Sequence, residues 1–250
     1  MQWTDNTILI TGGGSGIGAG LAAALHRAGN QVVIAGRRRE ALEAVARRHP
    51  GIAYVPLDQS DAGAVRAFAE EVVRRHPGLN VLINNAGIVR TEDLRAPDPD
   101  VIDEVISTNL IGPLLLTAHL LPALRRRPSS AIVNVTSSLA FVPKAALPTY
   151  CAAKAALHSY TESLRFQLRD SPIRVIEVPP PRVYLEAVPD DGYGVGVEEF
   201  VRDVMSLLAS RPEADEVVVD AATLLRFAER RGEYQKVYAT VNYENVKETQ

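Results

Sequence analysis

The strongest constraint on the fold is a regular alternation between short apolar runs, rich in β-branched residues, and longer segments with helical periodicity. Runs that are apolar on both faces indicate parallel strands covered by helices on both sides. Because crossovers between parallel strands are right-handed, the alternation predicts an α/β fold with a doubly wound parallel sheet of the Rossmann type. Strands are expected at Thr7–Thr11, Gln31–Ala35, Ala53–Leu57, Val81–Asn84, Ala131–Thr136, Arg174–Val178 and Glu216–Asp220. Helices are expected at Ile17–Ala28, Arg39–Arg48, Ala62–Arg75, Asp98–Arg127, Thr149–Asp170, Val197–Leu208 and Ala221–Arg230.

Length and composition describe an ordinary globular chain. The 250 residues include 46% hydrophobic and 23% charged side chains, both within the usual range of soluble proteins. No glycine- or serine-rich linker and no shift in composition divides the chain, so we expect a single domain over residues 1–250. A net charge of −3 argues against nucleic acid and against an anionic membrane surface as partners.

Three features favour a cytoplasmic protein. Cys151 is the only cysteine, so no disulfide can form within the chain. The N-terminal residues 1–6 lack lysine and arginine and lead directly into the first expected strand, unlike a signal peptide. No apolar run approaches the roughly 20 residues that span a bilayer. The five histidines show no metal-ligand spacing with cysteines or carboxylates, so no metal site is expected.

A glycine-rich loop joins the first expected strand to the first helix, with the spacing Gly-x-x-x-Gly-x-Gly. Glycines let the backbone approach a pyrophosphate closely, and the helix N-terminus supplies unpaired N–H groups and a positive dipole end. This context favours a dinucleotide site over a merely flexible turn. The residues expected at the phosphates are Gly12, Ser15, Gly16, Ile17 and Gly18.

The end of the second expected strand indicates which dinucleotide binds. An acidic residue at this place would hydrogen-bond the ribose 2′-hydroxyl and select NAD. The chain has Gly36 there, followed by Arg37 and Arg38. A guanidinium presents a planar fork of donors that suits a phosphate, so the sequence favours NADP(H) over NAD(H).

Four polar residues predict proton-transfer chemistry. Tyr150 and Lys154 lie four residues apart on one helix face, where a neighbouring ammonium would lower the pKa of the phenol. An acid/base tuned in this way suits the reduction of a carbonyl. Ser137 ends a buried strand thirteen residues before Tyr150 and can donate to a developing alkoxide, and Ser138 is the less favoured alternative. Asn109 is an amide in an otherwise apolar helix, where it must find partners.

Taken together, these residues resemble the short-chain dehydrogenase/reductase family in order and spacing. The matching positions run through most of the chain: Thr11, Gly12, Gly16, Ile17, Gly18, Asp58, Asn84, Asn85, Ala86, Gly87, Asn109, Ser137, Tyr150 and Lys154. The resemblance implies that Tyr150 donates or takes the substrate proton while Ser137 orients the carbonyl oxygen. It also implies that Lys154 lowers the Tyr150 pKa and holds the nicotinamide ribose, and that Asn109 positions a water in the proton relay.

Further cofactor contacts are implied by the same resemblance. Asp58 would face the adenine, and the segment from Asn84 through Ala86 to Gly87 would line the cofactor and brace the sheet. The backbone of Val183 is expected at the nicotinamide amide, and Pro180 is expected among the cofactor-binding residues. Three positions depart from the family pattern and affect the loops at the cofactor: Pro181 in place of glycine, Leu185 in place of threonine and Ala140 where glycine is common.

Three segments are similar to the DltE-like branch of the family: Asn6–Ile10, Ile176–Pro181 and Leu225–Arg230. The resemblance implies an NADP(H)-dependent ketone or aldehyde reductase that forms homodimers or homotetramers through long helices. A second hypothesis is a sensor or regulatory protein that binds NADP(H) without turnover. Such a protein is expected to lack one or more of the serine, tyrosine and lysine residues, and all three are present here. A nucleotide-sugar epimerase would need a larger C-terminal domain than the chain has left after Val183.

The substrate side is assigned to a glycine-containing loop at about residues 184–200. Its apolar side chains favour an apolar carbonyl compound: Leu185, Val188, Tyr193 and Val195. A polar tail at about residues 242–250 is expected to fray or to pack on a neighbouring subunit.

Overall fold

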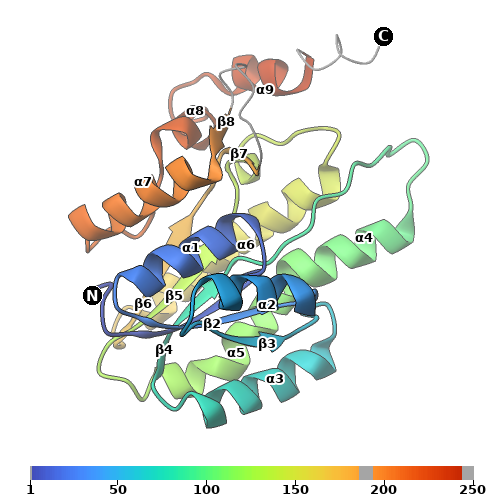
Figure 1. Cartoon of the computed structure of the whole chain (residues 1–250). Helices are drawn as coiled ribbons and strands as arrows, with labels where there is room; N and C mark the ends of the chain where they lie inside the picture. Colours follow the sequence, from blue (N-terminus) through green and yellow to red (C-terminus); the bar gives the residue numbers. More distant parts are fainter. Residues whose placement is uncertain (1, 186–193, 244–250) are drawn as a thin grey trace.

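A computed structural model describes residues 2–185 and 194–243, which form an α/β fold around one large parallel sheet (Figure 1). The sheet has six strands in the order β3-β2-β1-β4-β5-β6, and every neighbouring pair is parallel. The predicted doubly wound sheet is therefore confirmed. The strands are β1 (Thr7–Thr11), β2 (Gln31–Gly36), β3 (Ala53–Pro56), β4 (Leu79–Asn84), β5 (Ser130–Val135) and β6 (Ile173–Val178).

Helices cover both faces of this sheet, and alternate residues of each strand face opposite layers. On β1, Ile8 and Ile10 join one hydrophobic cluster and Leu9 joins the other. The first cluster packs beneath α1 (Gly16–Arg27), α2 (Arg39–Arg48) and α7 (Val197–Ser210). The second packs beneath α3 (Ala62–Arg75), α5 (Gly112–Leu124) and α6 (Pro148–Leu168).

The strand order places a crevice at the centre of the sheet. β1 pairs with β2 on one side and with β4 on the other, so the chain winds in opposite directions from β1. In such sheets, ligands bind outside the carboxyl ends of the strands at this switch point. The glycine loop follows β1, the arginines follow β2, and Asn85–Gly87 follows β4, so the topology brings all three segments to one edge.

The helix predicted at Asp98–Arg127 is interrupted. The structure has α4 (Pro99–Ile106), a π-helical segment (Ser107–Ile111) and α5 in succession. By length and composition alone, Pro99–Leu124 could cross a membrane. Its residues Leu116, Leu120 and Leu124 are buried in the second cluster, which is the behaviour of a core helix.

The C-terminal part departs most from the prediction. Instead of a strand at Glu216–Asp220, a single bridge joins Glu216 to Glu177 of β6, because the chain turns into a 3-10 helix at Asp220–Ala222. The helix predicted at Ala221–Arg230 is reduced to that turn and to α8 (Thr223–Arg226). Three elements were not predicted: β7 (Arg182–Tyr184), β8 (Gly194–Gly196) and α9 (Tyr234–Tyr243).

Two predicted segments fall partly outside the described residues. Of the loop at 184–200, Val188 and Tyr193 lie outside them, whereas β7 and β8 pair in parallel. Of the tail, Asn242 is described and belongs to α9. Its side chain donates to the Pro143 carbonyl at 3.1 Å and accepts from the Ala145 N–H at 2.6 Å. The start of the tail thus packs on its own chain, beside the loop that precedes α6.

Candidate active site

The glycine loop adopts a conformation that larger residues would not tolerate. Gly12 and Gly16 have φ values of 69° and 55°, in the left-handed region that favours glycine. A Cβ built at Gly18 would lie 2.3 Å from the Gly12 carbonyl oxygen, and one at Gly12 would lie 2.7 Å from the Ala86 Cα. The loop is therefore folded tightly against the segment after β4, and α1 starts with its N–H groups directed at the crevice.

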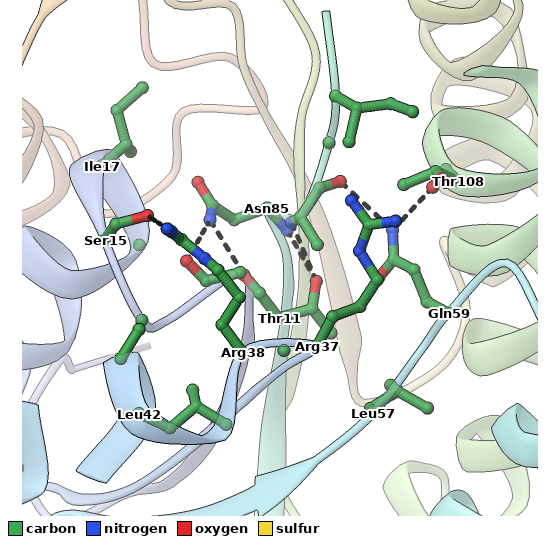
Figure 2. Close-up of a pocket in the computed structure, with 18 of the residues that line it drawn as sticks. Thr11, Ser15, Ile17, Arg37, Arg38, Leu42, Leu57, Gln59, Asn85 and Thr108 are labelled. Atoms are coloured by element: carbon green, nitrogen blue, oxygen red, sulfur yellow. Dashed lines mark hydrogen bonds between the residues drawn. The ribbon is translucent and has the colours of Figure 1, made fainter. Parts of the chain in front are cut away.

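Thr11 and Asn85 tie the loop to β4 (Figure 2). The Thr11 hydroxyl accepts from the backbone N–H of Asn85 at 3.1 Å and of Ala86 at 3.0 Å. The Asn85 side chain donates to the Thr11 carbonyl at 2.8 Å. Asn84 faces the other way: it is buried and donates to Thr117 and Asn134 in the core. It is therefore Asn85, and not the predicted Asn84, that reaches the crevice, while Asn84 braces the sheet.

A cavity of about 520 Å³ lies between the glycine loop, the end of β2 and the end of β4. A neighbouring cavity of about 420 Å³ shares Arg37, Leu57 and Asp58 with it. The Thr108 hydroxyl is buried in the wall and has no hydrogen-bond partner among the described residues. A buried polar atom left without a partner fits a wall completed by a polar ligand. The predicted cofactor residues that line the larger cavity are Gly12, Ser15, Ile17, Gly18, Arg37, Arg38, Asp58, Ala86, Gly87 and Val183.

Both arginines line the cavity, but from different sides: Arg38 reaches Ser15 of the glycine loop, whereas Arg37 extends toward Gln59 (Figure 2). Arg38 donates to the Ser15 hydroxyl at 3.0 Å, and no ion pair of Arg38 occurs within residues 2–185 and 194–243. Arg37 is about half exposed and lies 3.6 Å from Glu104. Within the described residues, Arg38 therefore faces the loop with a neutral partner, whereas Arg37 lies near a carboxylate.

Ser137, Tyr150 and Lys154 meet beside the cavity, between the end of β5 and the start of α6. Tyr150 is hydrogen-bonded to Ser137, which also accepts from the Leu139 N–H at 3.1 Å. The Lys154 Nζ lies 5.8 Å from the centre of the Tyr150 ring and donates to the Val135 carbonyl at 2.9 Å. A Cβ built at Gly87 would lie 3.6 Å from that Nζ, so this cluster adjoins the wall of the cavity.

Burial dominates the proton affinities of this cluster. It raises the pKa of Tyr150, and the hydrogen bond with Ser137 opposes the rise. It lowers the pKa of Lys154 to about 8. The pKa of Tyr150 thus moves in the direction opposite to the one predicted. The physical reason is that the Lys154 ammonium is directed at the Val135 carbonyl, so the loss of hydration of the phenolate outweighs its attraction.

Asn109 fixes the backbone that follows β4. Its amide donates to the Ile88 carbonyl at 2.8 Å, and its oxygen accepts from the Ile88 N–H at 2.8 Å. Asn109 lies in the π-helical segment, a rare element that is frequent at functional sites. Gln59 holds the same segment by donating to the carbonyls of Thr108 at 2.6 Å and Ala86 at 3.2 Å. Gln59 was not singled out in the sequence, because its partners are distant along the chain.

Glu92 is a second residue that the sequence did not reveal. Its carboxylate accepts from the Thr149 N–H at 3.1 Å and from the Thr149 hydroxyl at 2.6 Å. Its backbone N–H donates to Ala146. A carboxylate here interacts favourably with the positive end of α6, directly beside Tyr150.

The other predicted residues have different positions. Gly16 shapes the glycine loop without lining the larger cavity. Pro180 is buried, and its carbonyl accepts from the Ser138 N–H at 2.8 Å. Asp58 is exposed at the rim and binds Ser60 at 2.7 Å through its carboxylate. Among the described residues, no group of histidine, cysteine or carboxylate side chains could hold a metal ion.

Comparisons with known proteins agree with this geometry. The family model for short chain dehydrogenases matches residues 6–189. The chain is 43% identical to the uncharacterized oxidoreductase DltE of Bacillus subtilis, over 73% of each chain. It is 34% identical to dehydrogenase/reductase SDR family member 7B of Bos taurus, over 76% of this chain and 63% of that protein.

Solved structures share the fold. A short-chain dehydrogenase from Streptomyces avermitilis matches over the whole of both chains with a TM-score of 0.82 at 23% identity. A metagenomic short-chain oxidoreductase in complex with NADP matches 87% of this chain and 98% of that one, with a TM-score of 0.75 at 30% identity. The match to the family model and the identity to DltE, together with the glycine loop and the Ser-Tyr-Lys cluster, show that this chain belongs to the short-chain dehydrogenase/reductase family.

Proposed function

We propose that this protein is an NADP(H)-dependent oxidoreductase that transfers a hydride between the nicotinamide ring and a carbonyl/alcohol pair, acting as a ketone or aldehyde reductase. The observation that carries the proposal is the meeting of Ser137, Tyr150 and Lys154 beside the glycine-loop cavity, next to its lining residue Gly87. Lys154 and Asn109 both border Gly87, which itself lines that cavity. Groups able to move a proton thus adjoin a site able to hold a dinucleotide.

The chain's own residues would handle the proton and the substrate oxygen, and the reduced nicotinamide supplies the hydride when it is bound. Tyr150 gives its phenolic proton to the carbonyl oxygen, so that the carbonyl becomes an alcohol and the tyrosine becomes a phenolate. Ser137 donates a hydrogen bond to the same oxygen. Because burial raises the pKa of Tyr150, the residue holds its proton at neutral pH and is suited to act as the acid.

Lys154 would stabilise the phenolate that this transfer leaves behind. Its ammonium lies on the same helix face as Tyr150, 5.8 Å from the ring centre. An opposite charge at this range, with little water between, favours the ionised phenol. Asn109 keeps the Gly87–Ile88 backbone in place at the nicotinamide side of the cavity and, by the family resemblance, would position a water in the relay that returns a proton.

Preference for NADP(H) over NAD(H) is supported by the end of β2. No carboxylate follows Gly36 that could take a ribose 2′-hydroxyl. Arg38 faces the loop with a neutral partner, Ser15, and Arg37 lines the same cavity near Glu104. A 2′-phosphate beside Ser15 would gain charge-assisted hydrogen bonds from Arg38, and Arg37 would add positive charge to the same cavity.

We infer three coarser properties as part of the same proposal: one domain, a cytoplasmic location and a homodimer or homotetramer. The single domain is supported by the one large sheet, whose two faces are both covered by helices. Exposed apolar side chains on α4, α6 and the π-helical segment support assembly through these helices: Ile102, Phe166 and Ile111. Light scattering behind size-exclusion chromatography tests the assembly directly, and a monomer at micromolar concentration would contradict it.

The test of the activity is oxidation of NADPH by a panel of ketones, aldehydes, quinones and steroids. We expect Tyr150→Phe to lower kcat by about 10²- to 10⁴-fold while NADPH binding is retained. Tyr160→Phe is the matched control, because Tyr160 is a half-buried tyrosine of the same helix that packs on the core. Turnover that survives Tyr150→Phe would remove Tyr150 from its role. A protein that binds NADPH but turns over no compound would support the alternative of a non-catalytic sensor.

A further inference from the structure

A buried carboxylate lies behind the Ser-Tyr-Lys cluster and has no part in the mechanism above. Glu177 belongs to β6, and its side chain is almost completely buried. One carboxylate oxygen accepts from the Thr136 hydroxyl at 2.6 Å, and the other is 2.8 Å from Nδ1 of His158. Burying a carboxylate is costly unless it is paired and hydrogen-bonded, so these two contacts must hold Glu177 in a defined position.

The two partners of Glu177 are adjacent to the catalytic residues. Thr136 directly precedes Ser137 at the end of β5. His158 lies on α6, one turn beyond Lys154 and two turns beyond Tyr150, so the three side chains share one face of the helix. Glu177 therefore links the strand end that carries Ser137 to the helix face that carries Tyr150 and Lys154.

The surroundings of His158 contribute charge from two further elements. On its own helix, Glu162 is 3.8 Å from Nε2 and is mostly exposed. From α8, the Arg226 guanidinium lies over the Phe141 ring at 4.2 Å, and that ring meets His158 edge-on at 4.7 Å. Arg226 in turn pairs with Glu216, whose backbone is bridged to Glu177. These contacts connect the Glu177–His158 pair to the C-terminal segment that contains Glu216 and Arg226.

We propose that Glu177, Thr136 and His158 are positioning residues that hold Ser137 against Tyr150 and Lys154, and that the proton on His158 strengthens this hold. The inference rests on the function proposed above. An ion pair between His158 and Glu177 draws α6 toward the sheet at the level of the reacting groups. When His158 is neutral, its Nδ1–H can still donate, but the buried carboxylate loses its opposite charge.

The proton dependence has a defined direction. The hydrogen bond to Glu177, together with the charges of Glu177 and Glu162, raises the pKa of His158 above 6.5, while burial and Arg226 act against the rise. The ion pair is therefore fully formed below pH 6.5 and is lost as the pH rises through the raised pKa of the folded protein. The pKa of Tyr150 is raised above 10, so its titration falls in a separate range.

The first experiment compares two buried threonines near β5: Thr136, which follows β5 and binds Glu177 of β6, and Thr161 of α6, which binds β5 directly. Thr136→Val removes the hydroxyl bound to Glu177. Thr161→Val is the control, because Thr161 accepts from Asn134 of β5 at 2.8 Å, farther along α6 from Tyr150. We expect similar losses of thermal stability, but a kcat reduced about tenfold or more by Thr136→Val alone, with the KM for NADPH within about twofold of the parent. Equal kcat values for the two variants would overturn the proposal.

The second experiment uses Glu177→Gln and His158→Gln in the full-length protein with saturating NADPH. Glutamine has one acceptor oxygen where Glu177 accepts two bonds, so we expect Glu177→Gln to lower kcat at least as much as Thr136→Val. The parent kcat should decline above pH 6.5 with a step that His158→Gln removes. A step that persists in His158→Gln would overturn the role of its proton.

The two levels of inference fail in different ways. If Tyr150→Phe retains turnover, the proposed function is wrong, whatever the threonine variants do. If Tyr150→Phe is inactive while Thr136→Val, Glu177→Gln and His158→Gln all behave like Thr161→Val, the network is only structural. Should Glu177→Gln not fold, the comparison of Thr136→Val with Thr161→Val still decides between these outcomes.

Discussion

The proposed nucleotide side of the cavity consists of the glycine loop and the segment after β4, and the proposed catalytic side consists of Ser137, Tyr150 and Lys154. Each side is held in place by a different kind of contact. On the nucleotide side, the contacts are made to main-chain groups: Gly18 passes the Gly12 carbonyl with no room for a Cβ, and the Thr11 hydroxyl accepts from two main-chain N–H groups. On the catalytic side, buried side chains make the contacts. Lys154 binds a carbonyl of β5, and Glu177 binds both Thr136 and His158.

The two sides therefore differ in how their structure depends on charge. The nucleotide side presents glycines and N–H groups, whose position does not depend on pH. The catalytic side carries buried titratable groups whose pKa values burial has shifted, so its geometry and its charge are coupled. We therefore expect substitutions on the nucleotide side to act on cofactor affinity, and substitutions on the catalytic side to act on kcat and on its pH dependence.

The largest effect is expected from Lys154→Met. Without the ammonium, kcat should fall by about 10²- to 10⁴-fold, as for loss of a group that assists proton transfer. The free energy of unfolding at pH 7 should instead increase. Burial lowers the pKa of Lys154 from 10.5 to about 8, which corresponds to a cost of about 3 kcal/mol for the protonated form in the folded state. Loss of the hydrogen bond to Val135 offsets part of that gain.

The pH dependence of the free energy of unfolding tests this prediction. Between pH 8 and pH 10.5 the unfolded chain keeps the Lys154 proton that the folded chain has lost, so stability gained from this group rises across that range. Unfolding in urea at pH 7 and pH 10 should show Lys154→Met gaining relative to the parent at pH 7 and losing that advantage at pH 10. The exposed Lys236 provides the control as Lys236→Met. A difference that does not change with pH would contradict the lowered pKa.

On the nucleotide side, Gly18→Ala is expected to weaken NADPH binding by up to about 100-fold. A Cβ at this position would lie 2.3 Å from a backbone oxygen, so the loop must move, and overpacking of this kind costs about 1–3 kcal/mol. Gly29→Ala is the matched control, because Gly29 has a φ of 91° but nothing within 4 Å of the added Cβ. Titration of intrinsic fluorescence with NADPH measures both. Equal affinities for the two variants would show that close packing does not shape the site.

How much the sequence predicts follows from the same contrast. The glycine loop was predicted because a close backbone approach admits only glycine, at a spacing that is visible locally. The Tyr150 and Lys154 pair was predicted because a helix brings residues four apart onto one face. The strand order follows from the alternation of elements and the handedness of crossovers.

The remaining features depend on distant partners and leave no local pattern. Glu92 meets Thr149 across 57 residues, and Thr136 meets Glu177 across 41. The direction of the Tyr150 pKa depends on burial, which periodicity does not measure. The prediction of a strand at Glu216–Asp220 was wrong. A β-branched run forms a strand only where it can pair with an adjacent strand, and here the chain turns away from β6 after one bridge.

A smaller effect is expected from Arg38→Ala, which tests the contribution of positive charge on the nucleotide side. A charge-assisted hydrogen bond to a phosphate contributes about 1.5–3 kcal/mol, so the KM for NADPH should rise about 10- to 100-fold while the KM for NADH changes little. The control is Arg39→Ala, since the neighbouring Arg39 is exposed and pairs with Glu43 at 2.9 Å. Equal changes for NADPH and NADH would contradict recognition of a 2′-phosphate by Arg38.

The smallest expected effect concerns the cap of α6, where the contrast between the two sides is least marked. Glu92→Gln keeps the shape but removes the charge at the helix N-terminus, and its amide group would face one of the two donors of Thr149. We expect a loss of about 1 kcal/mol in the free energy of unfolding and a kcat lowered about twofold to fivefold. Asp98→Asn tests capping alone, because Asp98 caps α4 by accepting from the Asp100 N–H at 3.0 Å. If both variants lose stability but only Glu92→Gln loses kcat, the position of Tyr150 depends on this cap. If kcat is unchanged in both, the buried contacts of Lys154 and Glu177 hold the catalytic side without help from the helix end.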